Sequence, residues 1–111
     1  PKMSKDAGGD AIILNKMAEA AKNMVTEAVD AYVKQDLELA RKVMADDDIV
    51  DDYFCAIMSA IIRFVAKNPD EGEFALDLLM IAKYPERIGD HCTNIAEWVE
   101  FSITGVHKSC Q

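Results

Sequence analysis

The sequence predicts an all-α protein, an up-down-up bundle of three helices in which the second and third helices are long. Only 5 Gly and 3 Pro occur among 111 residues, and half of the residues are apolar. So few chain breakers favour long helices over a sheet with many turns. Apolar residues also return every three or four positions along three stretches, which is the periodicity of helices that pack on one face. The connections between these stretches are short, so consecutive helices are expected to run antiparallel.

The first helix is expected to run from Asp10, a good N-cap residue, to about Lys34. Residues 1–9 lack helical periodicity and contain the Gly8-Gly9 pair, so they are predicted to form a mobile tail or a linker. The apolar stripe of this helix consists of Leu14, Met17, Ala21, Met24, Ala28 and Tyr32.

The second helix is predicted over residues 37–67. Asp36 supplies its N-cap, and the Asn68-Pro69 pair ends it because proline disfavours helical geometry in the preceding residue. Its stripe contains Ala40, Met44, Asp47, Asp51, Phe54, Met58, Ile61 and Val65.

The third helix is predicted from residue 71 or 72 to Thr104, with Gly105 as its C-terminal stop. Pro85 lies inside it, removes one backbone hydrogen bond and is expected to bend the axis. The bundle is thus predicted over residues 10–106, followed by a tail at 107–111. The stripe of the third helix contains Phe74, Leu78, Ile81, Ile88, Cys92, Ile95 and Val99.

Charge and cysteine content narrow the class of function. The chain carries 20 Asp and Glu against 12 Lys and Arg, a net charge of -8. This balance argues against a nucleic-acid partner and suits a cation or a basic protein. The 3 cysteines form no CxxC pair. A disulfide framework or a zinc site is therefore not expected, and a reducing cytoplasm is the expected location.

Two acidic pairs are the candidate site. Asp47 and Asp51 occupy stripe or stripe-edge positions, where carboxylates are rare unless they are paired or bind a metal. Glu86 and Asp90 repeat the same spacing on the third helix, and Asp51 and Glu86 lie equally far from the turn at Asn68-Pro69. Antiparallel packing would bring the four carboxylates together, where repulsion raises pKa values unless a cation neutralises them. A solvated acidic surface without a metal is the alternative.

Neighbouring residues receive simpler interpretations. Gly89 lies between the acids, and its missing side chain is expected to let another helix or a metal-bound ligand approach closely. His91 is interpreted as a surface or packing residue. Cys55 is expected to be a buried free cysteine, and Cys92 to belong to the core.

The third-helix motif resembles a known family. Residues 81–97 read IAKYPERIGDHCTNIAE, and the ERIGD core followed by Asn94, Ile95 and Glu97 resembles the signature helix of the PhoU family of phosphate-transport regulatory proteins. The segment from Asp47 to Asp51 resembles the second acidic motif of that family. The resemblance extends from about residue 17 to residue 106.

This resemblance implies a three-helix bundle whose paired E/D-x-x-x-D motifs bind metal ions. The implied ligands are Asp47, Asp51, Glu86 and Asp90, with Asn94 as a neighbour. Oxygen ligands of this kind suit a multinuclear iron cluster, or manganese, magnesium or calcium. The implied role is that of a non-enzymatic cytoplasmic adaptor that represses the phosphate-starvation response. Its partners would be the ATPase of a phosphate ABC transporter and a sensor histidine kinase, through which it would be peripheral to the membrane.

Two departures and two alternatives accompany the resemblance. Family members usually contain two bundles in tandem, and this chain resembles the second one; Pro85 also falls where the family helix continues unbroken. A ferritin-like di-iron carboxylate enzyme is one alternative, but it requires Glu-x-x-His pairs, and no Glu lies three positions before His91 or His107. The other is a plain helical oligomerisation module, since a bundle with an unused apolar face commonly forms homo-oligomers.

Overall fold

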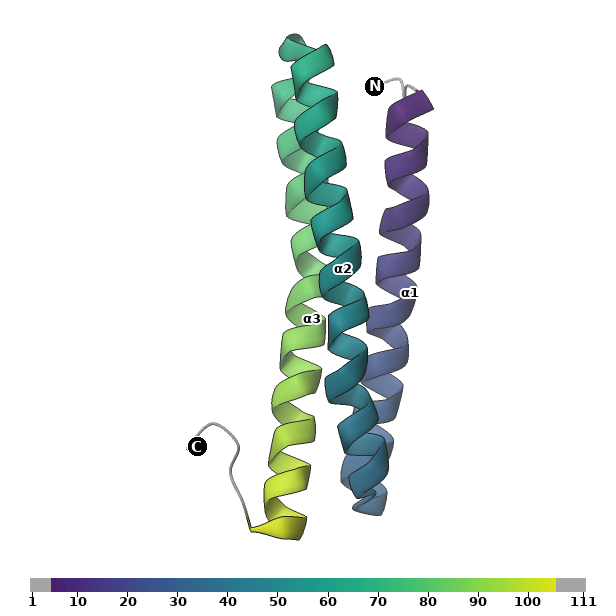
Figure 1. The fold of residues 1–111 in the computed structure, drawn as a ribbon, viewed down its shortest axis with the longest axis vertical. Coiled ribbons are helices and arrows are strands. Elements are labelled where there is room, and N and C mark those ends of the chain that lie inside the picture. The colour runs from purple at the N-terminus through teal and green to yellow at the C-terminus, as the bar shows by residue number, and fades with distance from the viewer. Residues whose placement is uncertain (1–4, 106–111) are drawn as a thin grey trace.

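The computed structural model describes the backbone of residues 5–105 and the side chains of residues 11–105. Three long helices lie side by side in the predicted up-down-up order, so α1 and α3 run in the same direction and α2 runs against both (Figure 1). The described part of the chain contains no strand. The elements are α1 (Lys5–Lys34), α2 (Leu37–Lys67), the short 3₁₀ helix η1 (Pro69–Glu71) and α3 (Gly72–Thr104).

The predicted ends of α2 and α3 are confirmed. The backbone N–H of Leu39 donates to the carboxylate of Asp36 at 3.1 Å, which caps the start of α2. At its end, the backbone N–H of Asn68 donates to the carbonyl of Phe64 at 2.8 Å, and Pro69 opens η1. Gly105 ends α3 in the left-handed region, at φ 77°, where a residue without Cβ is favoured.

The predicted start of α1 is wrong. The helix begins at Lys5, so Asp10 is an interior residue of the helix and not its N-cap, and the predicted tail overlaps the helix at residues 5–9. Glycine weakens a helix by about 1 kcal/mol relative to alanine without ending it. Residues 1–4, residue 106 and the predicted tail at 107–111 lie outside the described residues.

The interior of the bundle is filled by residues spaced alternately three and four apart, the pattern of helices that pack nearly parallel to one another. The buried hydrophobic residues of this core are Met17, Ala21, Met24, Ala28 and Ala31 on α1, Ala40, Val43, Val50, Ile57, Ala60, Ile61 and Phe64 on α2, and Ala75, Ala82, Cys92, Ala96 and Val99 on α3. Much of the α3 contribution is alanine, which lets this helix lie close to the other two.

The predicted stripe of α3 is wrong at three isoleucines. Ile81, Ile88 and Ile95 are exposed by 48%, 40% and 40%, whereas the small residues that follow each of them are buried. The interior of three closely packed helices has room for Ala and Gly at these levels, so the larger side chains lie on the flank. On α2 the predicted line of Met44, Phe54, Met58 and Val65 is half-buried along the edge of the core.

Two further observations bear on the predictions. Pro85 is buried within α3, and the helix continues through it from Gly72 to Thr104. Within residues 5–105, no helix combines the length and the apolar character needed to cross a membrane.

Candidate metal centre

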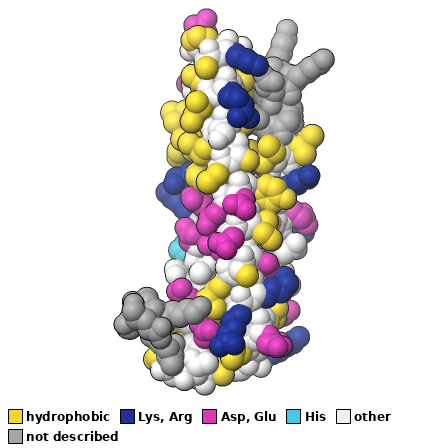
Figure 2. Space-filling model, viewed as in Figure 1, with side chains coloured by type: hydrophobic (Ala, Val, Ile, Leu, Met, Phe, Trp, Pro, Cys, Tyr) yellow, Lys and Arg dark blue, Asp and Glu magenta, His cyan; other side chains and the backbone are white. Residues whose placement is uncertain are grey.

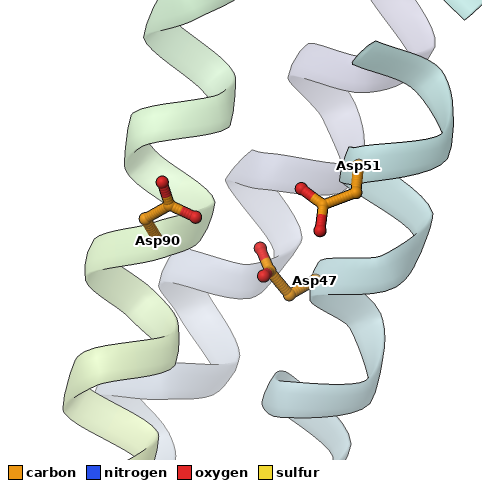
Figure 3. Close-up of side chains that lie close together, drawn as sticks. All are labelled: Asp47, Asp51 and Asp90. Atoms are coloured by element: carbon orange, nitrogen blue, oxygen red, sulfur yellow. The ribbon is translucent and has the colours of Figure 1, made fainter. Parts of the chain in front are cut away.

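Three carboxylates from two helices converge near the middle of the bundle. Asp47 and Asp51 project from α2 toward Asp90 on α3 (Figure 3), and one oxygen atom from each lies within 4.8 Å of the others. The spacing of four residues places Asp47 and Asp51 on one side of α2, and the short turn at η1 sets the level at which α3 returns. A space-filling view shows Asp and Glu side chains gathered at this level of the surface (Figure 2).

Asp47 occupies an interior position of α2, because it follows Val43 by four residues and precedes Val50 by three. Its residue is half-buried, and its Oδ1 atom is buried without any hydrogen-bond partner. The pKa of Asp47 is raised to about 6. Burial makes the largest contribution to this increase, followed by the charges of Asp51 and Asp90. A hydrogen-bonding contribution from the hydroxyl of Thr93 lowers this pKa and so makes the increase smaller.

The pKa of Asp51 is also raised. Burial raises the pKa of its carboxyl group, and the nearby charges of Asp90 and Glu86 raise it further. The neighbouring charges therefore make ionisation of Asp47 and of Asp51 less favourable. A bound cation would remove this repulsion and would satisfy the unpartnered oxygen of Asp47.

Gly89 explains how α3 fits against Asp47. A Cβ atom at Gly89 would lie 2.9 Å from Oδ1 of Asp47 and 3.6 Å from Cγ1 of Val50. The same Cβ position lies 3.7 Å from Sδ of Met24, so α1 also borders the site. The expected close approach of another helix at Gly89 is confirmed.

Glu86 lies outside the group of three. It is half-buried, and its Oε1 atom lies 3.5 Å from Nζ of Lys83, an ammonium group that also sits 5.5 Å from the centre of the Phe54 ring. Its charge still acts on Asp51. The structure therefore brings together three of the four predicted ligands, and the ligand role of Glu86 stays a prediction.

Asn94 is not among the converging side chains. It is exposed and lines an apolar hollow with residues of α1 and α3. His91 is exposed, consistent with the surface alternative. The interpretation of Cys55 is wrong, because this residue is exposed, whereas Cys92 is buried as predicted. Burial raises the pKa of the Cys92 thiol, and the charge of Asp47 adds to the effect.

Sequence reasoning missed two contributors to the site. Met24 was assigned only to the core, and its approach to Gly89 follows from the third helix packing behind the acidic pair. Lys83 was not considered, although its position three residues before Glu86 is the spacing of a helical ion pair.

The donor set fits a hard cation. Three carboxylates supply oxygen ligands, one oxygen is already desolvated, and the missing side chain at Gly89 lets α3 lie directly against that oxygen. Oxygen-rich sites of this kind select iron, manganese, magnesium or calcium over metals that prefer thiolates.

Comparisons with known proteins identify a family and several relatives. The PhoU domain model matches residues 14–99. A phosphate-specific transport system accessory protein PhoU homolog from Caulobacter vibrioides is 32% identical over 122 residues, covering 98% of this chain and 53% of that protein. Homologs with the same description from Borreliella burgdorferi and Zymomonas mobilis are 34% and 36% identical, covering 83% and 84% of this chain and 41% and 39% of their own.

The chain thus spans about half the length of the relatives it matches, or somewhat less. No solved structure matches it significantly.

Proposed function

This chain belongs to the PhoU family, and on that premise we propose that it is a metal-binding regulatory accessory of phosphate uptake. The relatives are described as accessory proteins of a phosphate-specific transport system. The proposal assigns the chain a regulatory part in such a system, on the cytoplasmic side of the membrane, and no catalytic step.

One observation carries the metal-binding part. Oδ1 of Asp47 is buried without a hydrogen-bond partner, and a carboxylate oxygen of the same residue converges with oxygens of Asp51 and Asp90. An unpartnered desolvated oxygen is costly, and a cation held by the three carboxylates would offset that cost. Iron in a multinuclear cluster is the proposed metal, with manganese, magnesium and calcium as the other candidates. A bound ion would supply positive charge that fixes the spacing of α2 and α3.

Glu86 is proposed as a further ligand at the edge of the site. Its carboxylate is close enough to influence Asp51, and its contact with Lys83 is long, at 3.5 Å. A partly exposed ion pair of this kind contributes on the order of 0–1 kcal/mol, which a metal–carboxylate bond would outweigh.

The adaptor part of the proposal concerns partners. We assign the ATPase of a phosphate ABC transporter and a membrane sensor histidine kinase as the proteins that bind the chain. The surface acidic side chains at the level of the metal centre (Figure 2) support a basic docking surface on a partner. The ferritin-like alternative gains no support from the candidate group of described residues, which contains only Asp and no His.

Metal content tests the site. Protein loaded anaerobically with Fe(II) or Mn(II) and then desalted should retain metal, and Asp51→Asn and Asp90→Asn should each lose most of it. Asp52→Asn is the matched control, because it removes one charge from the adjacent position of α2 without removing a member of the group. Equal retention in all four proteins would disprove the site.

Phosphate uptake tests the regulatory role. Cells that carry Asp51→Asn or Asp90→Asn in the native gene should take up phosphate faster under phosphate-rich conditions than wild-type cells, whereas Asp52→Asn cells should resemble the wild type. Unchanged uptake in cells that hold metal-free variant protein would separate metal binding from regulation and would refute the proposed link.

A further inference from the structure

A lysine side chain lies at the edge of the carboxylate group. The Nζ atom of Lys83 is 3.5 Å from Oε1 of Glu86 and 5.5 Å from the centre of the Phe54 ring. Phe54 belongs to α2 and Glu86 to α3, so the ammonium group lies against both helices that supply the acids. A positive charge of the chain itself is therefore placed beside the proposed metal centre.

The register of α2 and α3 explains this placement. Antiparallel helices joined by a short turn bring residues to the same level when they lie equally far from that turn. Three such pairs follow one another: Asp47 with Asp90, Asp51 with Glu86, and Phe54 with Lys83. The members on each helix are three or four residues apart, so they also share one side of it. The first two pairs are carboxylates, and the strip of negative charge ends at the ammonium group.

Glu86 is the carboxylate on which this ammonium group acts. The aspartates of the group converge, with Asp51 projecting toward Asp90 (Figure 3), whereas Glu86 lies outside. The charge of Glu86 nevertheless acts on Asp51. In the metal-free protein, repulsion from Asp51 and attraction to Lys83 both favour the observed position of Glu86.

The contacts of Lys83 are weak enough to be replaced. Its side chain is 43% exposed, and that of Glu86 is 22% exposed. An ion pair of this exposure and a cation–π contact at this distance are both minor interactions. A divalent ion carries twice the charge of an ammonium group, and several carboxylate oxygens can bind it directly at once. A metal ion held by the aspartates would therefore attract Glu86 away from Lys83.

We propose that Lys83 is an internal competitor of the metal ion, which pairs with Glu86 in the metal-free protein and releases it when a metal binds. This inference rests on the metal centre proposed above and adds a control on its affinity. Metal binding must break the contact between Lys83 and Glu86, and the ammonium group repels an incoming cation. Lys83 therefore makes metal binding weaker and more readily reversible. It is a positioning residue for Glu86 and not a ligand.

Metal affinity tests the competition. In calorimetric titration with Mn²⁺, Lys83→Met should bind about 3- to 10-fold more tightly than the wild type, because the variant lacks both the ion pair and the repelling charge. Methionine can still pack on the Phe54 ring. Lys83→Arg keeps a positive charge at this position and should stay within about 2-fold of the wild type.

Arg87→Met is the matched control for charge. Arg87 is exposed and adjacent to Glu86 in the sequence, and its substitution removes the same charge from the same turn of α3. The affinity of this variant should differ from that of the wild type by less than about 2-fold. A gain as large as that of Lys83→Met would show that any nearby positive charge has the same effect, and it would overturn the proposal.

A double-mutant cycle shows whether Lys83 acts through Glu86. In a Glu86→Gln background, Lys83→Met should change the Mn²⁺ affinity by less than about 2-fold, because the ion pair is already absent. An equal gain in both backgrounds would contradict an action through Glu86. An affinity of Lys83→Met that equals or falls below that of the wild type would contradict the competition itself.

NMR tests the release of Glu86. The ε-methylene signal of Lys83, assigned by its absence in Lys83→Met, should shift when diamagnetic Mg²⁺ saturates the wild type. It should shift much less when Mg²⁺ saturates Glu86→Gln. A wild-type signal that stays in place while the signals of Asp51 and Asp90 move would refute the release.

These outcomes separate the competition from the metal centre. If the wild type binds Mn²⁺ and Asp51→Asn does not, but Lys83→Met binds like the wild type, the metal centre stands and the competition is refuted. If the wild type binds no Mn²⁺, both are refuted. Circular dichroism of every variant must match that of the wild type, so that a change in affinity reports the site and not the fold.

Discussion

Oδ1 of Asp47 lies 2.9 Å from the point where a Cβ atom on Gly89 would stand. The two residues come from antiparallel helices, and the carboxylate of one is accommodated by the missing side chain of the other. This contact places an acid at an interior position of α2 without separating α2 from α3. The same contact keeps the Asp47 oxygen away from water, and it therefore links the packing of the bundle to the chemistry of the site.

Substituting Gly89 tests this link. In Gly89→Ala the new Cβ must displace the Asp47 carboxylate, so we expect metal affinity to fall at least about 10-fold. The stability should change by no more than about 1 kcal/mol, because the helix propensity of alanine offsets the altered packing. Gly72→Ala is the control, since no atom lies within 4 Å of its Cβ position. Calorimetric metal titration and urea unfolding of both variants check the prediction, and equal affinities would contradict it.

The pKa of Asp47 predicts a pH-dependent stability. Its carboxyl pKa is raised from 3.8 to about 6 on folding, so the folded state binds this proton more tightly than the unfolded state. The resulting contribution to the free energy of unfolding is fully present below about pH 4 and is lost as pH rises through 6. In metal-free protein, Asp47→Asn should remove this loss and increase stability at pH 7.5 relative to the wild type by about 1 kcal/mol, a value discounted for solvent screening.

Urea unfolding of metal-free wild type and Asp47→Asn between pH 4 and pH 8 measures the difference. Because the pKa of Asp51 is also raised, the free energy of unfolding of the variant should still fall as pH rises, but less steeply than that of the wild type. Two parallel curves would show that Asp47 does not titrate in this range.

A divalent cation should restore the stability that ionised Asp47 loses. At 100 times its dissociation constant, a ligand that binds only the folded state adds about 2.7 kcal/mol, which corresponds to an increase of roughly 10 °C in Tm for a chain of this size. We expect this increase with Mn²⁺ at pH 7.5 and a much smaller one at pH 5, where protons compete for the carboxylates. Thermal unfolding followed by circular dichroism, with Asp47→Asn as the comparison, tests this; the same increase in that variant would count against the site.

The pair Arg41 and Glu100 is expected to stabilise the lower part of the bundle. Glu100 is 5% exposed, and Nε of Arg41 lies 3.0 Å from its Oε2 atom. Arg41→Met removes this partner from a buried carboxylate and should reduce the free energy of unfolding by about 1–2 kcal/mol, less than for a fully buried pair because Arg41 is half-exposed. Arg63→Met, at an exposed position of the same helix, should change it by less than about 0.5 kcal/mol. Chemical denaturation compares the two.

Local signals in the sequence predicted the ends of α2 and α3, because Asp36, Pro69 and Gly105 each act on the backbone next to them. At the start of α1 the local signal was misleading, because Asp10 is a good N-cap residue and yet lies inside the helix. Gly8 and Gly9 only lower helix propensity, and the helix continues through them. The level at which the acids meet was also predictable, because the short turn determines how two antiparallel helices align.

Packing decided what the sequence left open. Large apolar residues were assigned to the interior of α3, but three close helices place alanine there and leave Ile88 and Ile95 on the surface. Glu86 contacts Lys83 instead of joining the three aspartates, and the exposure of Cys55 depends on the rotation of α2 about its axis. Consecutive residues of a helix point about 100° apart, so a buried position can be directly followed by an exposed one. Periodicity alone does not determine the rotation of the helix about its axis.

The anomalous scattering of Mn²⁺ in crystals of this protein tests the central claim most directly. We predict an anomalous peak bounded by Asp47, Asp51 and Asp90, with metal–oxygen distances of about 2.0–2.5 Å, and no such peak in crystals of Asp90→Asn. Crystals grown in millimolar Mn²⁺ that show no peak among these three carboxylates, or a peak only at another part of the surface, would contradict the assignment.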